Sequence, residues 1–363
     1  MKKFFAIAAA AAALVACNEK IEIQTPANTE MGTLSICVAP ESALLTKAAP
    51  EAYTAAQTYE AQANKLQILV FDASDGKLIH YEKFTSNITT TKDINVQAGS
   101  YNVYAIVNGP DITTAQQATE TAYKAVTIDL PTNSKTAATG FVMTGSAANI
   151  AVTAQSGGTA AITVKRHTSR VALHKVTNAC PAAYGDITIQ NVWLANVVAN
   201  QTVVGEDAPA TWYNKFSRKN ETPLNVANII TSSSADEAAL TFKAIGQNVA
   251  TGAAYTPATP DLVYGYANST TSLVTFDKAN FQSTFAPTKT RLVVEAKVNG
   301  TVYYYPYDLA FTARNKAHTI DMIISGPGLD DPQGNPEDLK KNTLSVTVTI
   351  ADWEAGESQE VSY

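Results

Sequence analysis

The chain has 363 residues, of which 45% are hydrophobic and 16% are charged. This composition supports a sizeable core and excludes a disordered, collagen-like or disulfide-dense chain. Lys and Arg number 26 against 32 Asp and Glu, and an acidic balance without basic blocks argues against nucleic acid as a partner. At about 150 residues per domain, the length predicts two domains.

The first 17 residues, MKKFFAIAAAAAALVAC, have the layout of an export signal. Two lysines precede an apolar run that is too short for a membrane span. The run ends in LVAC, and a Cys placed directly after a small residue favours lipidation of Cys17 over an ordinary signal peptide. Acyl chains on Cys17 would anchor the exported protein in a membrane.

The other two cysteines, Cys37 and Cys180, leave two interpretations open. They form one disulfide in an oxidising compartment, or they are two buried free thiols, which is the favoured interpretation. The chain contains no CxxC, HExxH, GxSxG or P-loop pattern. We therefore expect no cofactor and no enzymatic activity.

Alternation of apolar and polar residues predicts many short strands after a polar tether at 18–32. The first strand is predicted at 33–39, and residues 40–64 are interpreted as an exposed connection. Runs at 66–71 and 77–84 predict a hairpin. Further strands are predicted at 100–107, 126–130, 160–164, 170–176, 186–194, 262–266, 291–298, 301–307, 318–324 and 344–350, with one helix at 235–245.

Short strands with few helices predict an all-β chain of two β-sandwich domains that meet near residue 165. The first and last strands share one pattern, in which every second residue is apolar. In the first strand the apolar face is Leu34, Ile36 and Val38. In the last it is Leu344, Val346, Val348 and Ile350, followed by Trp353. Two such strands at opposite ends of the chain are able to fill equivalent slots in a sandwich.

Lys47 lies between the first strand and the body of the chain, where a trypsin-like protease would find a basic site. Cleavage there would remove the first strand and leave an apolar groove with an unpaired edge. Such an edge is a template for strand addition from another molecule. The alternative is that both strands belong to the sheets of the monomer and that Lys47 is a surface residue.

Several segments carry a family resemblance. They are the LVAC ending at Cys17, the strand 100–108 ending in Asn, the basic run 164–172, the run 314–318, the run 324–328, Asn335-Pro336, and the alternating strand that ends at Trp353. With these segments the whole chain resembles the fimbrillin family, the subunits of the type V pili of Bacteroidales. It is most similar to the major, shaft-forming members.

The resemblance implies two β-sandwich domains of the transthyretin-like or Greek-key type, and polymerisation by donor-strand exchange. It implies a lipoprotein signal peptide at 1–17, a propeptide with the first strand at 18–47, an N-terminal domain at 48–165, and a C-terminal domain at 166–363 with the donor strand at 344–353. The best-known members are cleaved after Arg. Here Lys47 stands at that position, before Ala48.

The implied protein is a pilus shaft subunit of the outer membrane and the surface fimbrium. Its implied partners are other fimbrial subunits, including tip and anchor proteins, a trypsin-like protease, the outer membrane before cleavage, and host or bacterial surface ligands. One alternative is a tip, accessory or anchor subunit of the same pilus. Another is a carbohydrate-binding surface lipoprotein that uses Trp212 and Tyr303–Tyr307.

Overall fold

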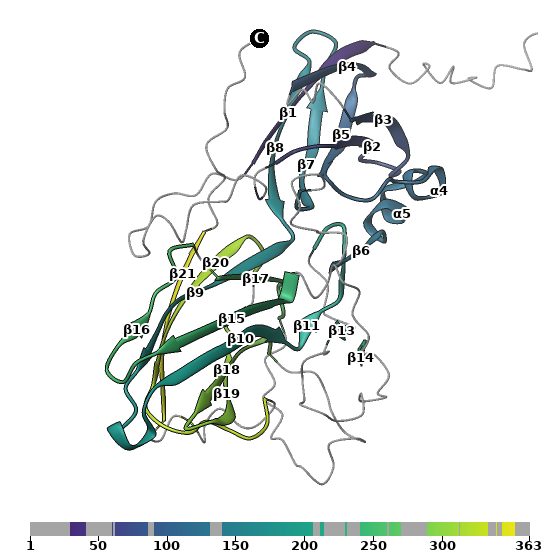
Figure 1. Cartoon of the computed structure of the whole chain (residues 1–363). Coiled ribbons are helices and arrows are strands. Elements are labelled where there is room, and N and C mark those ends of the chain that lie inside the picture. The colour runs from purple at the N-terminus through teal and green to yellow at the C-terminus, as the bar shows by residue number, and fades with distance from the viewer. Residues whose placement is uncertain are drawn as a thin grey trace, which may run out of the picture.

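A computed structural model describes residues 30–40, 60, 62–85, 91–130, 140–205, 211–213, 229–230, 240–259, 261–269, 289–311, 313–332, 339 and 343–352. Two β-rich domains follow one another along the long axis of the molecule (Figure 1). The predicted all-β fold is confirmed. The α-helices described, α4 (Thr114–Gln117) and α5 (Glu120–Lys124), are short, and no helix in these ranges is long and apolar enough to cross a bilayer.

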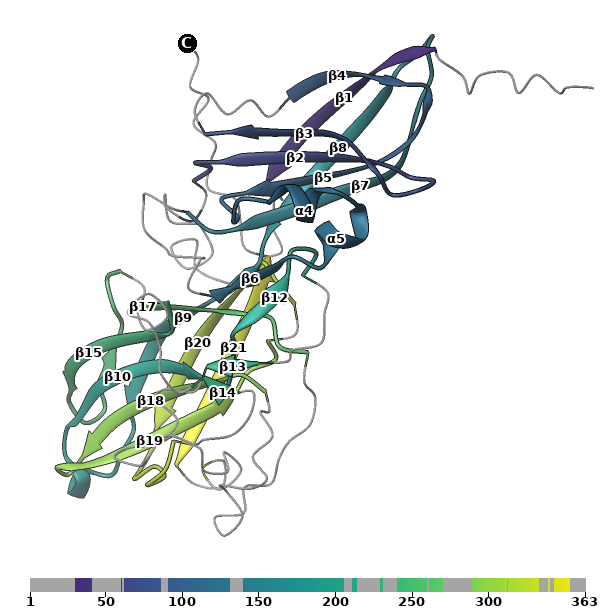
Figure 2. The same ribbon diagram turned by 90° about the vertical axis from the view of Figure 1, so that its right-hand side faces the viewer.

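The N-terminal domain is one sheet of seven strands in the order β3-β2-β5-β7-β8-β1-β4. The strands are β1 (Met31–Pro40), β2 (Leu66–Asp72), β3 (Leu78–Phe84), β4 (Thr91–Gln97), β5 (Gly99–Val107), β7 (Met143–Val152) and β8 (Gly158–Arg166). Because β7 and β8 pair only at Met143↔Arg166 and Thr144↔Lys165, the sheet divides there into two layers (Figure 2). Apolar side chains of β1, β4 and β8 meet those of β2 and β5 between the layers.

Strand β2 is buried on both faces, which explains its nearly continuous apolar sequence LQILVFD. Ile68 and its even-numbered neighbours face the core between the layers. Leu69 and Phe71 face the other way, into a second core that also holds Tyr104 and Tyr123. The hairpin predicted at 66–71 and 77–84 is confirmed as the antiparallel pair β2–β3.

The C-terminal domain packs two sheets against each other, as predicted for a sandwich, around a core that is continuous with the second core of the N-terminal domain. One sheet has the order β15-β10-β18-β19, and in the other β9 pairs β16, β17 and β20, while β20 pairs β21. The strands are β9 (Thr168–Asn178), β10 (Ile187–Ala195), β15 (Phe242–Val249), β16 (Ala254–Tyr255), β17 (Asp261–Tyr266), β18 (Arg291–Val298), β19 (Thr301–Asp308), β20 (Lys316–Ile324) and β21 (Leu344–Asp352). Strand β21 ends its sheet.

The domains are joined by the chain itself and by a pair of short strands. The chain passes from β8 to β9 at His167, and β6 (Thr127–Asp129) pairs antiparallel with β12 (Asn200–Thr202) (Figure 2). Three further short strands, β11 (Val197–Val198), β13 (Trp212–Tyr213) and β14 (Ile229–Ile230), form a small separate sheet.

The helix predicted at 235–245 is wrong from Phe242 onward, because Phe242–Val249 is the edge strand β15, whereas Leu240 and Thr241 are helical. Opposite β10 the pairing steps from Ile189↔Gln247 to Asn191↔Ala244, so β15 carries an extra residue there. Gly246 has φ +69° at this bulge, a conformation that glycine adopts easily. The bulge breaks the period-2 alternation, and the remaining apolar spacing imitates a helix.

Two other expectations need correction. Residues 40–64 were expected to be an exposed connection, but Glu60 is fully buried. The two remaining cysteines are both free; Cys180 is buried as expected, whereas Cys37 is exposed. Cys37 is exposed because it stands on the outer face of β1, between Ile36 and Val38, which point inward.

Candidate functional site

Strand β1 fills a slot between β4 and β8, which we call the β1 slot. It pairs antiparallel with β4 and parallel with β8. Leu34 and Ile36 are 0% exposed and Val38 is 5% exposed, all within the core between the layers. Among the described strands, β4 has no partner besides β1. Removal of β1 would therefore open a deep apolar groove and leave β4 without a neighbour.

The β1 slot is narrow at the position that Gly32 occupies, because the backbone of Thr153 lies close to it. A Cβ atom at Gly32 would lie 2.4 Å from the carbonyl oxygen of Thr153, so no larger residue fits there without a shift of backbone. The slot thus offers the three apolar positions of Leu34, Ile36 and Val38 before it narrows. A replacing strand would have to match this spacing.

Strand β21 is the last described strand in the sequence. It lies at the edge of its sheet and pairs with β20 alone among the described strands. Leu344, Val346 and Val348 are half-buried against the C-terminal core, and Ile350 is 48% exposed. In this structure β21 therefore sits in the sheet of its own domain. The apolar faces of β1 and β21 occupy different domains, and Cys17, Lys47, Ala48 and Trp353 lie outside the described residues.

The two strands differ in how firmly they are held. Strand β1 has two neighbours and a fully buried face, whereas β21 has one neighbour and a half-buried face. Full burial of an aliphatic side chain contributes about 1.5–3 kcal/mol. Moving three half-buried side chains into a slot like that of β1 would gain roughly 2–4 kcal/mol, as an upper value.

His318 is a residue of β20, and it pairs with Ile350 of β21 in the ladder between these two strands. Its ring is 1% exposed and packs against Phe311 with 5.0 Å between ring centroids. Neither ring nitrogen has a hydrogen-bond partner among the described residues. Burial, with a smaller contribution from the charge of Lys316, lowers the pKa of His318 to about 4, so the ring is neutral at pH 7.

We expect this histidine to make the C-terminal domain sensitive to acid. An exposed histidine has a pKa near 6.5, whereas the pKa of His318 in the folded chain is about 4. Between these two pH values the unfolded chain therefore binds a proton at this residue and the folded chain does not. Stability is therefore complete above the unfolded pKa and falls as the pH drops toward the folded pKa. His318→Leu should remove about 2 kcal/mol of the loss between pH 7 and pH 5. Urea unfolding at both pH values tests this, and equal losses in both proteins would contradict it.

A buried polar cluster ties the connection before β2 to the C-terminal domain. Glu60 accepts a hydrogen bond from Tyr264 at 2.6 Å and pairs with Arg170 at 2.9 Å. The Arg166 side chain donates from Nε to the backbone carbonyl of Glu60 and from Nη1 to Asn315. We call Glu60, Arg166, Arg170 and Tyr264 the junction cluster.

Sequence reasoning missed the junction cluster, although it noted the runs 164–172 and 314–318. These runs lie side by side because β9 and β20 are parallel neighbours. Asn315 has φ +59° and receives Arg166. Asn108, at the end of β5, has φ +56° and holds the chain around residues 62–64 with its side-chain amide. The charged residues Arg166 and Arg170, which stand within an apolar run, are the sequence signal for this cluster. Their partner Glu60 gives no such signal, because its segment shows no alternation of apolar and polar residues.

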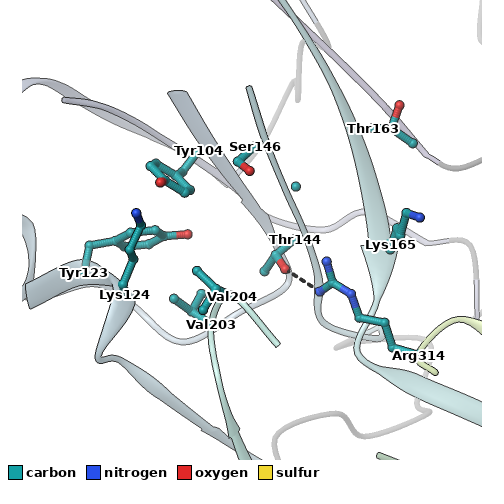
Figure 3. A pocket seen from close by; sticks show the side chains of 11 residues that line it. Tyr104, Tyr123, Lys124, Thr144, Ser146, Thr163, Lys165, Val203, Val204 and Arg314 are labelled. Carbon is teal, nitrogen blue, oxygen red and sulfur yellow. Dashed lines mark hydrogen bonds between the residues drawn. The ribbon is translucent and has the colours of Figure 1, made fainter. Parts of the chain in front are cut away.

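Beside the junction cluster lies a cavity of about 480 Å³, which we call the junction pocket (Figure 3). Lys124, Lys165 and Arg314 line it from α5, β8 and the segment before β20. It also has hydroxyl groups in its wall, from Tyr104, Tyr123, Thr144, Ser146 and Thr163.

A chain of hydrogen bonds positions Arg314 at this pocket. Its Nη1 donates to Thr144 Oγ1 at 2.9 Å and lies 3.3 Å from His167 Nε2. His167 Nδ1 lies 3.4 Å from Gln201 Oε1, and Gln201 Nε2 donates to the carbonyl of Ala267. These contacts fit a neutral His167 that carries its proton on Nδ1 and accepts at Nε2. Burial and the nearby Arg314 charge lower the pKa of His167 to about 3.

The fold of the chain is similar to that of proteins of solved structure that are named for cell adhesion or for fimbriae. A protein named for cell adhesion from Bacteroides eggerthii is 19% identical, with a TM-score of 0.62 over 90% of this chain and 97% of that one. A fimbrilin from Porphyromonas gingivalis is 13% identical, with a TM-score of 0.60 over 90% and 98%. The tip fimbrial protein Mfa3 from the same organism is 15% identical, with a TM-score of 0.51 over 89% and 100%.

Residues 33–178 match the model of the family described as Major fimbrial subunit protein (FimA). The match begins within β1 and ends at the last residue of β9. The resemblance to fimbrillins is thereby confirmed, and the chain is similar to subunits of surface fimbriae. No curated protein matches the chain.

Proposed function

We propose that this protein is the shaft subunit of a cell-surface fimbria. In this proposal the chain is exported as a lipoprotein through Cys17 and is cleaved after Lys47. It then polymerises by donor-strand exchange, with β21 of one subunit entering the β1 slot of the next. The FimA family match and the fimbrilin-like fold support a pilus subunit in general.

The observation that carries the proposal is the placement of β1. It is the first described strand, it lies between two neighbours, and its apolar face is completely buried. A strand that precedes the rest of the domain in the sequence and completes its core can be detached by a single proteolytic cleavage. The exposed edge strand β21 has the same alternation and is held less firmly, which supports its role as the replacement.

We expect mature fibres to contain a chain that begins at Ala48. Trypsin-like cleavage after Lys47 would detach β1 together with Cys17 and Cys37. N-terminal sequencing of purified fibres tests this. Fibres whose subunits still carry Cys17 or Asn18 would contradict it and would favour a lipid-retained anchor subunit.

Cys17→Ala should abolish acylation and reduce the number of surface fibres, because the precursor loses its anchor for transport to the outer membrane. Metabolic labelling with a fatty acid and electron microscopy measure the two effects. Cys180→Ala is the matched control, since that cysteine is buried in the C-terminal domain. A normal fibre yield from Cys17→Ala would argue against this route.

A tip, accessory or anchor role in the same pilus is the second candidate, and the fold is similar to that of the C-terminally truncated tip protein Mfa3 over the whole length of that truncated chain. A tip needs a β1 slot but no donor strand, so it would tolerate loss of β21. The carbohydrate-binding alternative rested on Trp212 and Tyr303–Tyr307. Trp212, Tyr304 and Tyr305 are buried, and Tyr303 and Tyr307 are half-buried against the core, so this set offers no fully exposed aromatic platform for a sugar.

A further inference from the structure

We propose that β4 is a movable wall of the β1 slot, and that a contact of Lys92 with Glu82 and Phe84 is the latch that holds this wall closed. The latch belongs to the N-terminal domain and can be tested in the uncleaved precursor. Its consequence for assembly rests on the proposed function.

Strand β4 is the weaker of the two walls of the β1 slot. Among the described strands it pairs with β1 alone, whereas β8 also pairs with β7. Only Ile94 and Val96 of β4 are buried, and its other residues are exposed or half-buried. An edge strand with few buried apolar side chains opens locally at a lower free energy than a central strand does, so β4 is the wall that is able to move.

The two ends of β4 are held in different ways. At its last residue, Gln97, the backbone carbonyl accepts a hydrogen bond of 2.6 Å from the Tyr101 hydroxyl group, and a single residue leads to β5. At its first residue, the connection 85–90 from β3 is long enough to span up to about 20 Å. Strand β4 would therefore pivot near Gln97 and open at the end that carries Lys92.

Lys92 holds the end that would open. Its Nζ atom lies 3.1 Å from the Glu82 carboxylate and 5.8 Å from the centroid of the Phe84 ring. His80 Nε2 lies 3.3 Å from the same carboxylate. Partial burial raises the pKa of Glu82, but the hydrogen bonds from Lys92 and His80 outweigh this effect and hold the pKa below its ordinary value. The carboxylate is therefore ionised at pH 7 and attracts Lys92.

The latch closes the open side of the N-terminal domain. Strands β3 and β4 are the two ends of the strand order, and they lie at the same side of the domain in Figure 2. Lys92 shares a face of β4 with the buried Ile94 and Val96, because residues two apart in a strand point the same way. Its side chain therefore leaves β4 at the edge of the core between the layers and reaches β3 in the other layer.

The register places the latch beside the centre of β1. Lys92 is opposite Ile36, the middle one of the three buried apolar residues, and the ladder ends one pair later. From there β1 continues to Pro40, toward the proposed cleavage site at Lys47. In the proposed maturation, cleavage would give β1 a free end on this side, and opening of β4 would let β1 leave from that end. In an empty slot the latch would keep β4 in place for the incoming strand.

Amide hydrogen exchange of the full-length precursor, followed by mass spectrometry at pH 7, tests the latch. Lys92→Met keeps an unbranched side chain without its charge, and Glu82→Gln removes the other charge. In both variants we expect residues 91–97 to exchange about three- to fivefold faster, as for the loss of one partly exposed ion pair. Residues 99–107 of β5 should exchange as in wild type, because β5 lies between β2 and β7.

Lys83→Met is the matched control. Lys83 is the next residue of β3 after Glu82 and pairs with Asp111 at 2.6 Å, so its substitution removes an ion pair of β3 that does not involve β4. This variant should leave the exchange of residues 91–97 unchanged. The double variant Lys92→Met with Glu82→Gln should exchange no faster than Lys92→Met alone, because one contact is lost only once.

Three results would overturn the latch. The first is unchanged exchange of β4 in both single variants. The second is equal acceleration of β4 and β5, which would show a general loss of stability. The third is a double variant whose acceleration equals the product of the two single effects, which would show that Lys92 and Glu82 act independently.

A second measurement separates the latch from the proposed function. After limited trypsin cleavage at Lys47, the detached β1 segment should leave Lys92→Met about three- to fivefold faster than it leaves wild type, and size-exclusion chromatography with mass spectrometry follows its release. If Lys92→Met accelerates the exchange of β4 but the β1 segment stays bound in both proteins, the latch is supported and the proposed strand exchange is contradicted.

Discussion

Val348→Asp should yield a precursor that is exported and lipidated but forms no high-molecular-weight ladder of its own on unheated SDS gels. In the monomer Val348 is half-buried at the edge of the C-terminal sheet, so a carboxylate there keeps part of its hydration. In the β1 slot the equivalent positions are 0–5% exposed. A buried charge without a partner costs several kcal/mol, which is comparable to the whole expected gain from strand transfer.

The same mutant should still accept a donor, because its β1 slot is unchanged. Mixed with wild-type subunits it should therefore terminate fibres and shorten them in proportion to its share. Thr347→Asp is the matched control, since Thr347 is exposed on the opposite face of β21 and should ladder almost like wild type.

Two outcomes would argue against the assignment of β21 as donor. A normal ladder from Val348→Asp would show that another strand fills the slot. Absence of any precursor would show that the monomer needs β21 for its own core. The pairing of β21 with β20 and its packing against the core support this alternative.

The sequence is sufficient to predict the strands whose two faces differ. The alternation of Leu34, Ile36 and Val38 predicts β1, because burial of one face imposes period 2. Strand β2 is buried on both faces, and its continuous apolar run before a turn predicts the hairpin with β3. Strand β4 was missed because only Ile94 and Val96 interrupt its polar residues. Strand β15 was missed because its bulge at Gly246 changes the period.

Contacts between distant segments were not predictable in the same way. The junction cluster joins Glu60 to Arg170 and Tyr264, across 110 and 204 residues of sequence. No local periodicity encodes such a pairing, because it depends on the order of strands in the sheets. The burial of Glu60 also contradicts the usual expectation that a polar connecting segment is exposed.

We expect Glu60→Gln to lower the free energy of unfolding strongly, and the size of this loss measures the importance of the pairing. The Glu60 side chain is 0% and that of Arg170 1% exposed. The substitution removes the carboxylate that pairs with the buried Arg170 guanidinium, and loss of one partner of a buried ion pair typically costs about 3–5 kcal/mol. We expect a loss of this size in urea unfolding of the C-terminal domain, followed by the fluorescence of the buried Trp193.

The decisive comparison is the double variant Glu60→Leu with Arg170→Met. Replacement of both charges by apolar side chains of similar volume is often neutral or stabilising, so this variant should recover most of the stability that Glu60→Gln loses. Lys92→Gln, which breaks the surface pair with Glu82, is the control and should cost no more than about 1 kcal/mol. If Glu60→Gln were as mild as Lys92→Gln, the charge of Glu60 would not anchor the segment that follows the proposed cleavage site. In the proposed maturation, cleavage after Lys47 would remove β1, while Glu60 would still join the remaining chain to β9 and β17 through Arg170 and Tyr264.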